Sequence, residues 1–138
     1  MIEERSCGAI LYRNSPSGKL YLLLNYPSGH WDFVKGNIEK GETFKETALR
    51  EIKEETGISD VNFIDGFENK VQYHYQRDGK VVHKEVVFFL AETSTEYVEI
   101  SHEHLGFTWL KFNEALAKLT YKTAQNLLKK VSELGFET

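Results

Sequence analysis

The sequence predicts an α+β sandwich that forms one domain over residues 1–138. Segments with strand composition and segments with helical spacing follow one another without a regular β-α-β repeat, which favours this class over a doubly wound sheet. The length is usual for one domain and allows about two-thirds of the unfolded surface to be buried. With 41% hydrophobic and 28% charged residues, the composition is that of an ordinary folded protein.

The N-terminal part of the chain predicts a β-hairpin. Residues 7–13 and 19–25 are rich in apolar and aromatic side chains, and residues 14–18, which separate them, contain several turn-forming types. Residues 31–34 predict another brief strand, and we expect a glycine-bearing loop over residues 36–41.

Residues 44–56 predict a helix. Thr43 followed three positions later by Glu46 fits a capping box, and Gly57 fits the helix stop. Apolar residues recur at four-residue spacing through this segment, at Phe44, Ala48 and Ile52.

A longer hairpin is expected after the helix. Residues 61–76 and 80–91 have the composition of two long strands, and they are joined at residues 77–79, where Asp-Gly is a strong hairpin signal. The chain shows no internal repeat, low-complexity segment or linker.

The C-terminal part predicts one more strand and two helices. The strand is expected over residues 107–112, and Asn113 is expected to cap a short helix over residues 114–119. Residues 122–134 predict a final amphipathic helix that ends at Gly135.

Charge and composition argue against several functional classes. The net charge of −4 disfavours broad binding to nucleic acid or to anionic membranes, so we expect no stable nucleic-acid partner. No apolar run reaches the roughly 20 residues that span a bilayer, and the N-terminus lacks the pattern of a signal peptide, so a cytoplasmic protein is expected. Cys7 is the only cysteine, and we interpret it as a buried, inert thiol rather than a nucleophile.

Three glutamates are candidates for metal binding. Glu54 and Glu55 lie three and four positions after Glu51, so on a helix these carboxylates project from one side within reach of a common point. Such like charges repel unless a cation lies between them, and hard oxygen ligands favour magnesium or manganese over zinc. The alternative is an acidic helix face that is simply solvated.

Residues 36–58 as a whole resemble the Nudix box. In that motif a glycine is followed at set spacings by a glutamate, an Arg-Glu pair, an aliphatic residue, a Glu-Glu pair, a glycine and a final aliphatic residue. The matching residues are Gly36, Glu42, Arg50, Glu51, Ile52, Glu54, Glu55, Gly57 and Ile58. The resemblance implies a Nudix α/β/α sandwich with a mixed central β-sheet and a magnesium-dependent hydrolase of phosphoanhydride bonds.

The resemblance to the Nudix box also implies roles for its residues. Glu51, Glu54 and Glu55 would bind the catalytic cations, together with the backbone carbonyl of Gly36, and Glu54 would take part in catalysis. The remaining fixed positions would be mainly structural, namely Glu42, Arg50 and Gly57.

Outside the box, nearly the whole chain resembles the asymmetrically cleaving diadenosine tetraphosphate hydrolases. The matching stretches are residues 6–10, 31–36, 66–67, 88–92, 101–104 and 109–110. A tyrosine some fifteen to eighteen residues beyond the box is typical of this subgroup, and Tyr73 and Tyr75 both fall in that range. Val34 and Asn37 depart from the usual proline and histidine, which affects the loop around Lys35 and not the metal site.

This second resemblance implies contacts to a polyphosphate. Lys35 and Lys84 are candidates for binding phosphate, with a solvated surface cation as the alternative for each; binding is favoured for Lys35. Glu103 would be a further metal ligand or the general base, with an exposed turn as its alternative. The aromatic candidates for stacking on adenine are Tyr73, Phe88 and Tyr121, with core packing as the other interpretation, favoured for Phe88.

The implied reaction is hydrolysis of diadenosine tetraphosphate to AMP and ATP. Removal of pyrophosphate from an RNA 5′ end or a nucleoside triphosphate remains open, because these substrates share the same polyphosphate core. A catalytically silent nucleotide sensor is the alternative from another class, although such modules typically lose box carboxylates that this chain retains. The sequence leaves the oligomeric state open.

Overall fold

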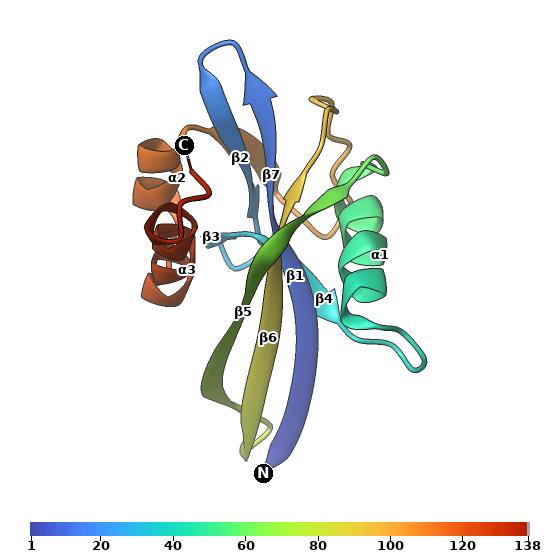
Figure 1. Cartoon of the computed structure of the whole chain (residues 1–138). Coiled ribbons are helices and arrows are strands. Elements are labelled where there is room, and N and C mark those ends of the chain that lie inside the picture. The colour runs from blue at the N-terminus through green and yellow to red at the C-terminus, as the bar shows by residue number, and fades with distance from the viewer. Residues whose placement is uncertain (138) are drawn as a thin grey trace.

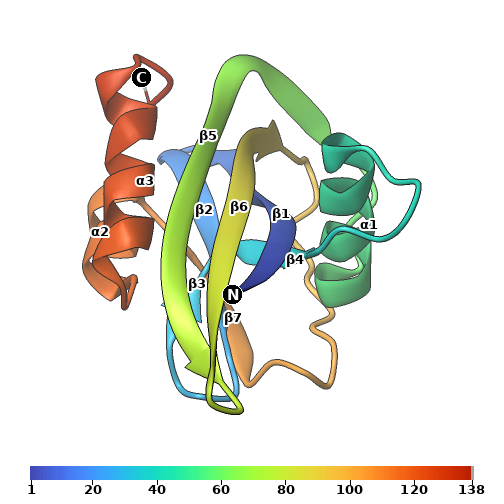
Figure 2. The same ribbon diagram turned by 90° about the horizontal axis from the view of Figure 1, so that it is seen from below.

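The computed structural model describes residues 1–137, and the chain forms a mixed β-sheet covered by helices on both faces (Figures 1 and 2). Helix α1 (Phe44–Thr56) covers one face, and α2 (Phe112–Lys118) and α3 (Lys122–Glu133) cover the other. The expected α+β sandwich with a mixed central sheet is therefore confirmed. In the described residues, no helix is long and apolar enough to cross a membrane.

The sheet has seven strands and is organised around β1 (Ile2–Ser15). The strand β6 (Lys80–Glu92) runs parallel to β1 along residues 2–12 of β1. On the other edge, β1 pairs antiparallel with β2 (Gly18–Asn25) and β4 (Val34–Asn37). The remaining strands are β3 (Trp31–Asp32) and β7 (Gly106–Leu110), both on β2, and β5 (Asn62–Arg77), on β6.

The structure corrects two strand predictions in the N-terminal part. β1 begins at Ile2, because residues 2–6 pair with β6, some eighty positions away in the sequence, which no local pattern indicates. The expected strand over residues 31–34 is divided at Phe33, and Gly36 and Asn37, predicted as loop, belong to β4 because they pair with β1.

A third correction concerns the start of α2. Asn113 was expected to cap this helix, but the N-cap is Lys111, with no side-chain cap, and Asn113 lies inside the helix. The helix starts early because Phe112 packs on the core, where its ring meets Tyr21 edge-on at 6.1 Å. Strand β7 consequently ends at Leu110, two residues earlier than predicted.

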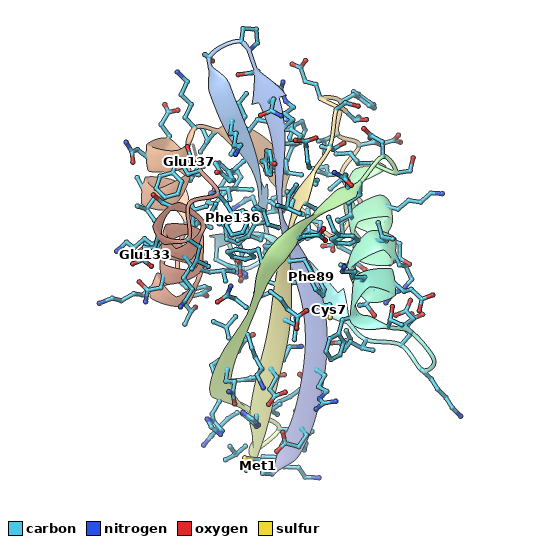
Figure 3. The ribbon with its side chains drawn as sticks, in the orientation of Figure 1. Met1, Cys7, Phe89, Glu133, Phe136 and Glu137 are labelled. Carbon is cyan, nitrogen blue, oxygen red and sulfur yellow. The ribbon has the colours of Figure 1, made fainter. Side chains whose placement is uncertain are left out.

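Each face of the sheet buries its own apolar cluster. The larger lies beneath α2 and α3, where Phe136 also packs edge-on against Phe67 with ring centroids 5.8 Å apart (Figure 3). On the α1 face, Cys7 and Phe89 contact Ala48 of the helix. Burial raises the pKa of Cys7 to about 11, so this thiol stays protonated at neutral pH, in agreement with its expected inertness.

Candidate active site

Local sequence signals place α1 where they predict it. Thr43 accepts a hydrogen bond from the backbone N–H of Glu46, whose side chain accepts one from the backbone N–H of Thr43, so the capping box forms. Gly57 ends the helix with a φ of 77°, a conformation that glycine adopts without the penalty of a Cβ. The helix therefore presents its acidic residues from a rigid element.

Arg50 organises the loop that precedes the helix. Its guanidinium donates two hydrogen bonds to the carboxylate of Glu42, at 2.6 and 3.0 Å, and another to the backbone carbonyl of Asn37 at 3.0 Å. These hydrogen bonds from Arg50 lower the pKa of Glu42 to about 2, with help from the backbone N–H of Glu39. The loop and α1 are thus held together by an ionised pair.

Arg50 also binds Glu54. One guanidinium nitrogen lies 2.7 Å from a carboxylate oxygen of Glu51 and 3.2 Å from one of Glu54. The Glu54 side chain is 57% exposed, whereas that of Glu51 is only 14% exposed. Glu51 and Glu54 therefore share one Arg50 nitrogen, and Glu54 is the more exposed of the two. Of the three helical carboxylates expected to converge, Glu51 and Glu55 lie next to each other.

Glu51 and Glu55 form a buried pair beside Gly36. A Cβ built on Gly36 would lie only 2.0–2.4 Å from the carboxylate atoms of Glu51. Glu55 is 4% exposed, and its burial and then the adjacent Glu51 carboxyl raise its pKa to about 9. Two carboxylates in so little water repel each other when both are ionised, and a cation would relieve this.

These residues line a cavity of about 470 Å³, which we call the carboxylate cavity. Its lining residues are Tyr26, Pro27, Lys35, Gly36, Glu51, Glu55, Glu103 and His104. Glu103 comes from the loop before β7, whose backbone binds α1 through a hydrogen bond of 3.2 Å from Ser101 N to the carbonyl oxygen of Glu55. Three carboxylates from two separate segments therefore face one cavity.

The donors fit a hard divalent cation. Glu55 Oε2 is buried and has no hydrogen-bond partner, so one oxygen is left for a ligand. Within residues 1–137, no three acidic, histidine or cysteine side chains are close enough to form a preformed metal centre. Magnesium is usually held by one or two carboxylates together with water and substrate phosphates, so it does not require such a centre.

A second and larger cavity, the aromatic pocket, adjoins the first. It measures about 900 Å³ and is lined by Tyr26, Ser28, His30, Asp32, Lys35, Tyr73, Tyr75, Tyr121, Lys122 and Thr123. Tyr26 and Lys35 line both cavities. Burial would lower the pKa of Lys35, but the carboxylate of Asp32, 3.0 Å from its Nζ, outweighs this effect and the pKa is raised.

Two of the sequence candidates lie apart from these main cavities. Lys84 Nζ donates to Asn37 Oδ1 at 2.9 Å and lies 3.5 Å from Glu4 Oε1, on the β1–β6 surface. Phe88 is 3% exposed and meets Phe33 edge-on in the core, so it presents no open ring face. Its burial agrees with the core interpretation favoured from the sequence.

Several residues of the site received no role from the sequence. Tyr26 and His30 lie between the predicted strands at residues 19–25 and 31–34, and their rings stack 4.7 Å apart, with both in the aromatic pocket and Tyr26 also in the carboxylate cavity. His104 lies next to Glu103, and its Nε2 is 2.5 Å from Glu55 Oε1. The available signal was a cluster of histidine and tyrosine in turns on either side of an acidic helix.

A carboxylate cavity that meets an aromatic pocket at a largely buried lysine is the arrangement that a hydrolase of nucleoside polyphosphates requires. The chain belongs to the Nudix family: a NUDIX domain model matches residues 4–131, nearly its whole length. This confirms the resemblance found in residues 36–58. Nudix hydrolases generally need divalent metal ions.

Among its relatives are enzymes that act on dinucleoside polyphosphates. The mouse bis(5′-nucleosyl)-tetraphosphatase [asymmetrical] is 36% identical over 137 residues, which cover 91% of this chain and 90% of the relative. The enzyme of the same name from Caenorhabditis elegans is 31% identical, with 93% and 94% covered. The subgroup resemblance is therefore confirmed as well.

Solved structures agree with these sequence relatives. A crystal structure of a C. elegans Ap4A hydrolase binary complex superposes with a TM-score of 0.83 at 29% identity, covering 95% of this chain and 96% of the other. The E. coli dihydroneopterin triphosphate pyrophosphohydrolase superposes with a TM-score of 0.78 at 21% identity, which supports the fold alone.

Proposed function

We propose that this protein hydrolyses diadenosine tetraphosphate asymmetrically, to AMP and ATP, with magnesium as its cation. The observation that carries the proposal is the position of Lys35, which lines both the aromatic pocket and the carboxylate cavity. A ligand with a base at one end and a long anionic chain at the other would place its base in the aromatic pocket and its chain past Lys35 in the carboxylate cavity. The mouse and C. elegans relatives named for this reaction support the choice of substrate.

The aromatic pocket would hold one adenosine. Tyr73 and Tyr121 line it, and Tyr121 is 50% exposed, so its ring is available to a base. Stacking on an aromatic ring contributes about 1–3 kcal/mol per base and requires only a planar face. Selection for a nucleoside would therefore come from this pocket, and Phe88 would support it from the core.

The phosphate chain would then pass Lys35 into the carboxylate cavity. The buried ammonium of Lys35 offsets phosphate charge at the junction, and Lys84 would contact the chain only from the β1–β6 surface. Glu51, Glu55 and the carbonyl of Gly36 would hold the cation, and Glu54 would join them after leaving Arg50. When bound, the cation neutralises phosphate oxygens and acidifies a coordinated water.

Glu103 is the better placed general base. Glu103 lines the carboxylate cavity, whereas Glu54 is not among its lining residues. Glu103 would accept the proton from the attacking water, and Glu51 and Glu55 would hold their ligand oxygens still. Arg50 and Glu42 would keep the loop in place throughout.

A substrate panel tests the function. Purified protein with magnesium would be assayed with diadenosine tetraphosphate, other dinucleoside polyphosphates, capped and triphosphorylated RNA, ADP-ribose and nucleoside triphosphates, with products separated by chromatography. We expect the highest kcat/KM for diadenosine tetraphosphate, equal yields of AMP and ATP, and loss of activity with EDTA that magnesium restores. In ¹⁸O-labelled water, the label should enter a single product.

Other outcomes separate the alternatives. Preferred release of pyrophosphate from triphosphorylated RNA or from nucleoside triphosphates would replace the proposed substrate and retain the reaction class. Binding of nucleotides without cleavage of any would identify a sensor and would refute the enzymatic proposal.

A further inference from the structure

The His104 side chain has contacts on two sides, and its Nδ1 is buried without a hydrogen-bond partner. Its Nε2 lies 2.5 Å from Glu55 Oε1, and the side chain is 3% exposed. Its ring lies perpendicular to that of Tyr26 with centroids 4.7 Å apart. Tyr26 is fixed in turn, because its hydroxyl donates to the carbonyl of Phe33 at 2.6 Å. The imidazole therefore lies between the Tyr26 ring and the Glu55 carboxyl group and contacts both.

The backbone around His104 is tied to two different elements. Ser101 N donates to the carbonyl of Glu55 in α1, and His104 N donates to the carbonyl of Ser101 at 3.1 Å. On the other side, Leu105 N donates to the carbonyl of Asn25, the last residue of β2, at 2.8 Å. The contact between His104 and Glu55 thus closes a short segment that also carries Glu103.

The consequence for Glu55 is that its two oxygens are unequal. Oε1 is engaged by His104, whereas Oε2 is buried without a hydrogen-bond partner beside the carboxylate cavity. Although burial raises the pKa of Glu55, a cation at its free oxygen favours the ionised form. An imidazole Nε2–H then donates to Oε1 and stops the carboxylate from rotating. A ligand that needs a carboxylate oxygen then finds it already oriented.

We propose that His104 is a positioning residue that holds Glu55 with one oxygen free for a divalent cation. His104 itself touches neither cation nor substrate and acts through Glu55. Ligating carboxylates are commonly held by such outer hydrogen bonds, whose removal lowers metal affinity or activity about 10- to 100-fold. The inference deepens the proposed function and rests on it, because that function puts the cation at Glu55.

Two substitutions separate the hydrogen bond from the ring. His104→Phe keeps an aromatic ring against Tyr26 and removes the donor, whereas His104→Gln removes the ring and places an amide N–H near the position of Nε2. Mn²⁺ affinity would be measured by electron paramagnetic resonance of the free ion, independently of turnover. We expect His104→Phe to weaken Mn²⁺ binding and lower kcat about 10- to 100-fold. His104→Gln should stay within about threefold of the wild-type protein in both.

Controls exclude a general effect on folding. His102→Ala changes an exposed neighbour in the same turn and should leave Mn²⁺ affinity and kcat at wild-type values. AMP affinity measured without cation reports the aromatic pocket and should be unchanged in every variant. If His104→Phe does not fold, His104→Asn, whose shorter amide does not reach Glu55, replaces it in the comparison with His104→Gln.

Two results would overturn the proposal. One is wild-type Mn²⁺ affinity in the variant that lacks the donor, and the other is equal loss in His104→Gln and His104→Phe. If the wild-type protein cleaves no polyphosphate, the proposed function is wrong, but the role of His104 is still tested. The Mn²⁺ affinities of His104→Phe and His104→Gln then decide whether His104 positions Glu55.

Discussion

Gly36 and Glu51 are in such close contact that a methyl group on Gly36 would overlap the Glu51 carboxylate. The overlap involves the end of a flexible side chain and no backbone atom. A larger residue at position 36 would therefore displace the carboxylate and leave the strand intact. Because Gly36 of β4 has no side chain, the Glu51 carboxylate of α1 can lie against it.

We predict that Gly36→Ala lowers kcat at least tenfold and changes the free energy of unfolding by less than about 1 kcal/mol, because only Glu51 moves. Turnover of diadenosine tetraphosphate and chemical denaturation measure the two effects. Gly106→Ala, with open space around its Cβ, should be neutral in both. Gly8→Ala should instead destabilise the fold, because its Cβ would lie 2.3 Å from the carbonyl oxygen of Val34.

Glu54→Gln and Glu55→Gln should each reduce kcat about 100-fold or more, if both residues serve the cation as proposed. Glu54 is exposed, so its variant should unfold like the wild-type protein. Glu55→Gln replaces a buried carboxyl of raised pKa by a neutral group of the same shape, so no loss of stability is expected. Glu133→Gln, on the exposed side of α3, is the matched control. An unchanged rate in either variant would remove that residue from the site.

Tyr121→Ala should raise the KM for diadenosine tetraphosphate about 5- to 150-fold, which corresponds to the 1–3 kcal/mol of one stacked base. Because Tyr121 lines the aromatic pocket and not the carboxylate cavity, kcat should change little. Initial-rate kinetics separate the two constants. Tyr97→Ala, at a tyrosine that is 73% exposed and outside both cavities, should leave KM unchanged. A fall in kcat without a change in KM would contradict base stacking.

Asp60→Asn should destabilise the fold at neutral pH by about 1 kcal/mol, a value reduced for solvent screening at this exposed site. Asp60 accepts hydrogen bonds from Ser94, Thr95 and Thr93, which lower its pKa. A carboxyl whose pKa is lowered by folding stabilises the protein above its ordinary pKa of about 4, and this contribution is lost as the pH falls through the folded-state value. Denaturation at several pH values should show the two proteins converging in acid; a constant difference would refute this.

The sequence was most informative where structure depends on neighbouring residues. Helix α1 begins and ends at the predicted residues, because the capping box of Thr43 and Glu46 and the αL conformation of Gly57 are local. The hairpin at Asp78-Gly79 was found for the same reason. The acidic residues of α1 and their box spacing likewise identified the class of protein.

Contacts between segments far apart in the sequence could be predicted less well. The first residues of β1 are strand only because β6 lies beside them. Phe33 divides a predicted strand, and its backbone N–H donates to the Asp32 side chain at 2.7 Å instead of to a neighbouring strand. Spacing on the helix placed Glu51, Glu54 and Glu55 on one side, but it did not reveal that only Glu51 and Glu55 of the three line the carboxylate cavity.

By itself, then, the sequence determined the secondary-structure elements near strong local signals, the Nudix family and the acids of the box. Only the tertiary structure decided which of those acids share a cavity, that Tyr26 and Lys35 join it to the aromatic pocket, and that His104 meets Glu55. The physical reason is how far apart in the sequence the interacting residues lie. Caps and turns depend on hydrogen bonds between residues a few positions apart, whereas the direction of a charged side chain depends on partners brought close by the whole fold.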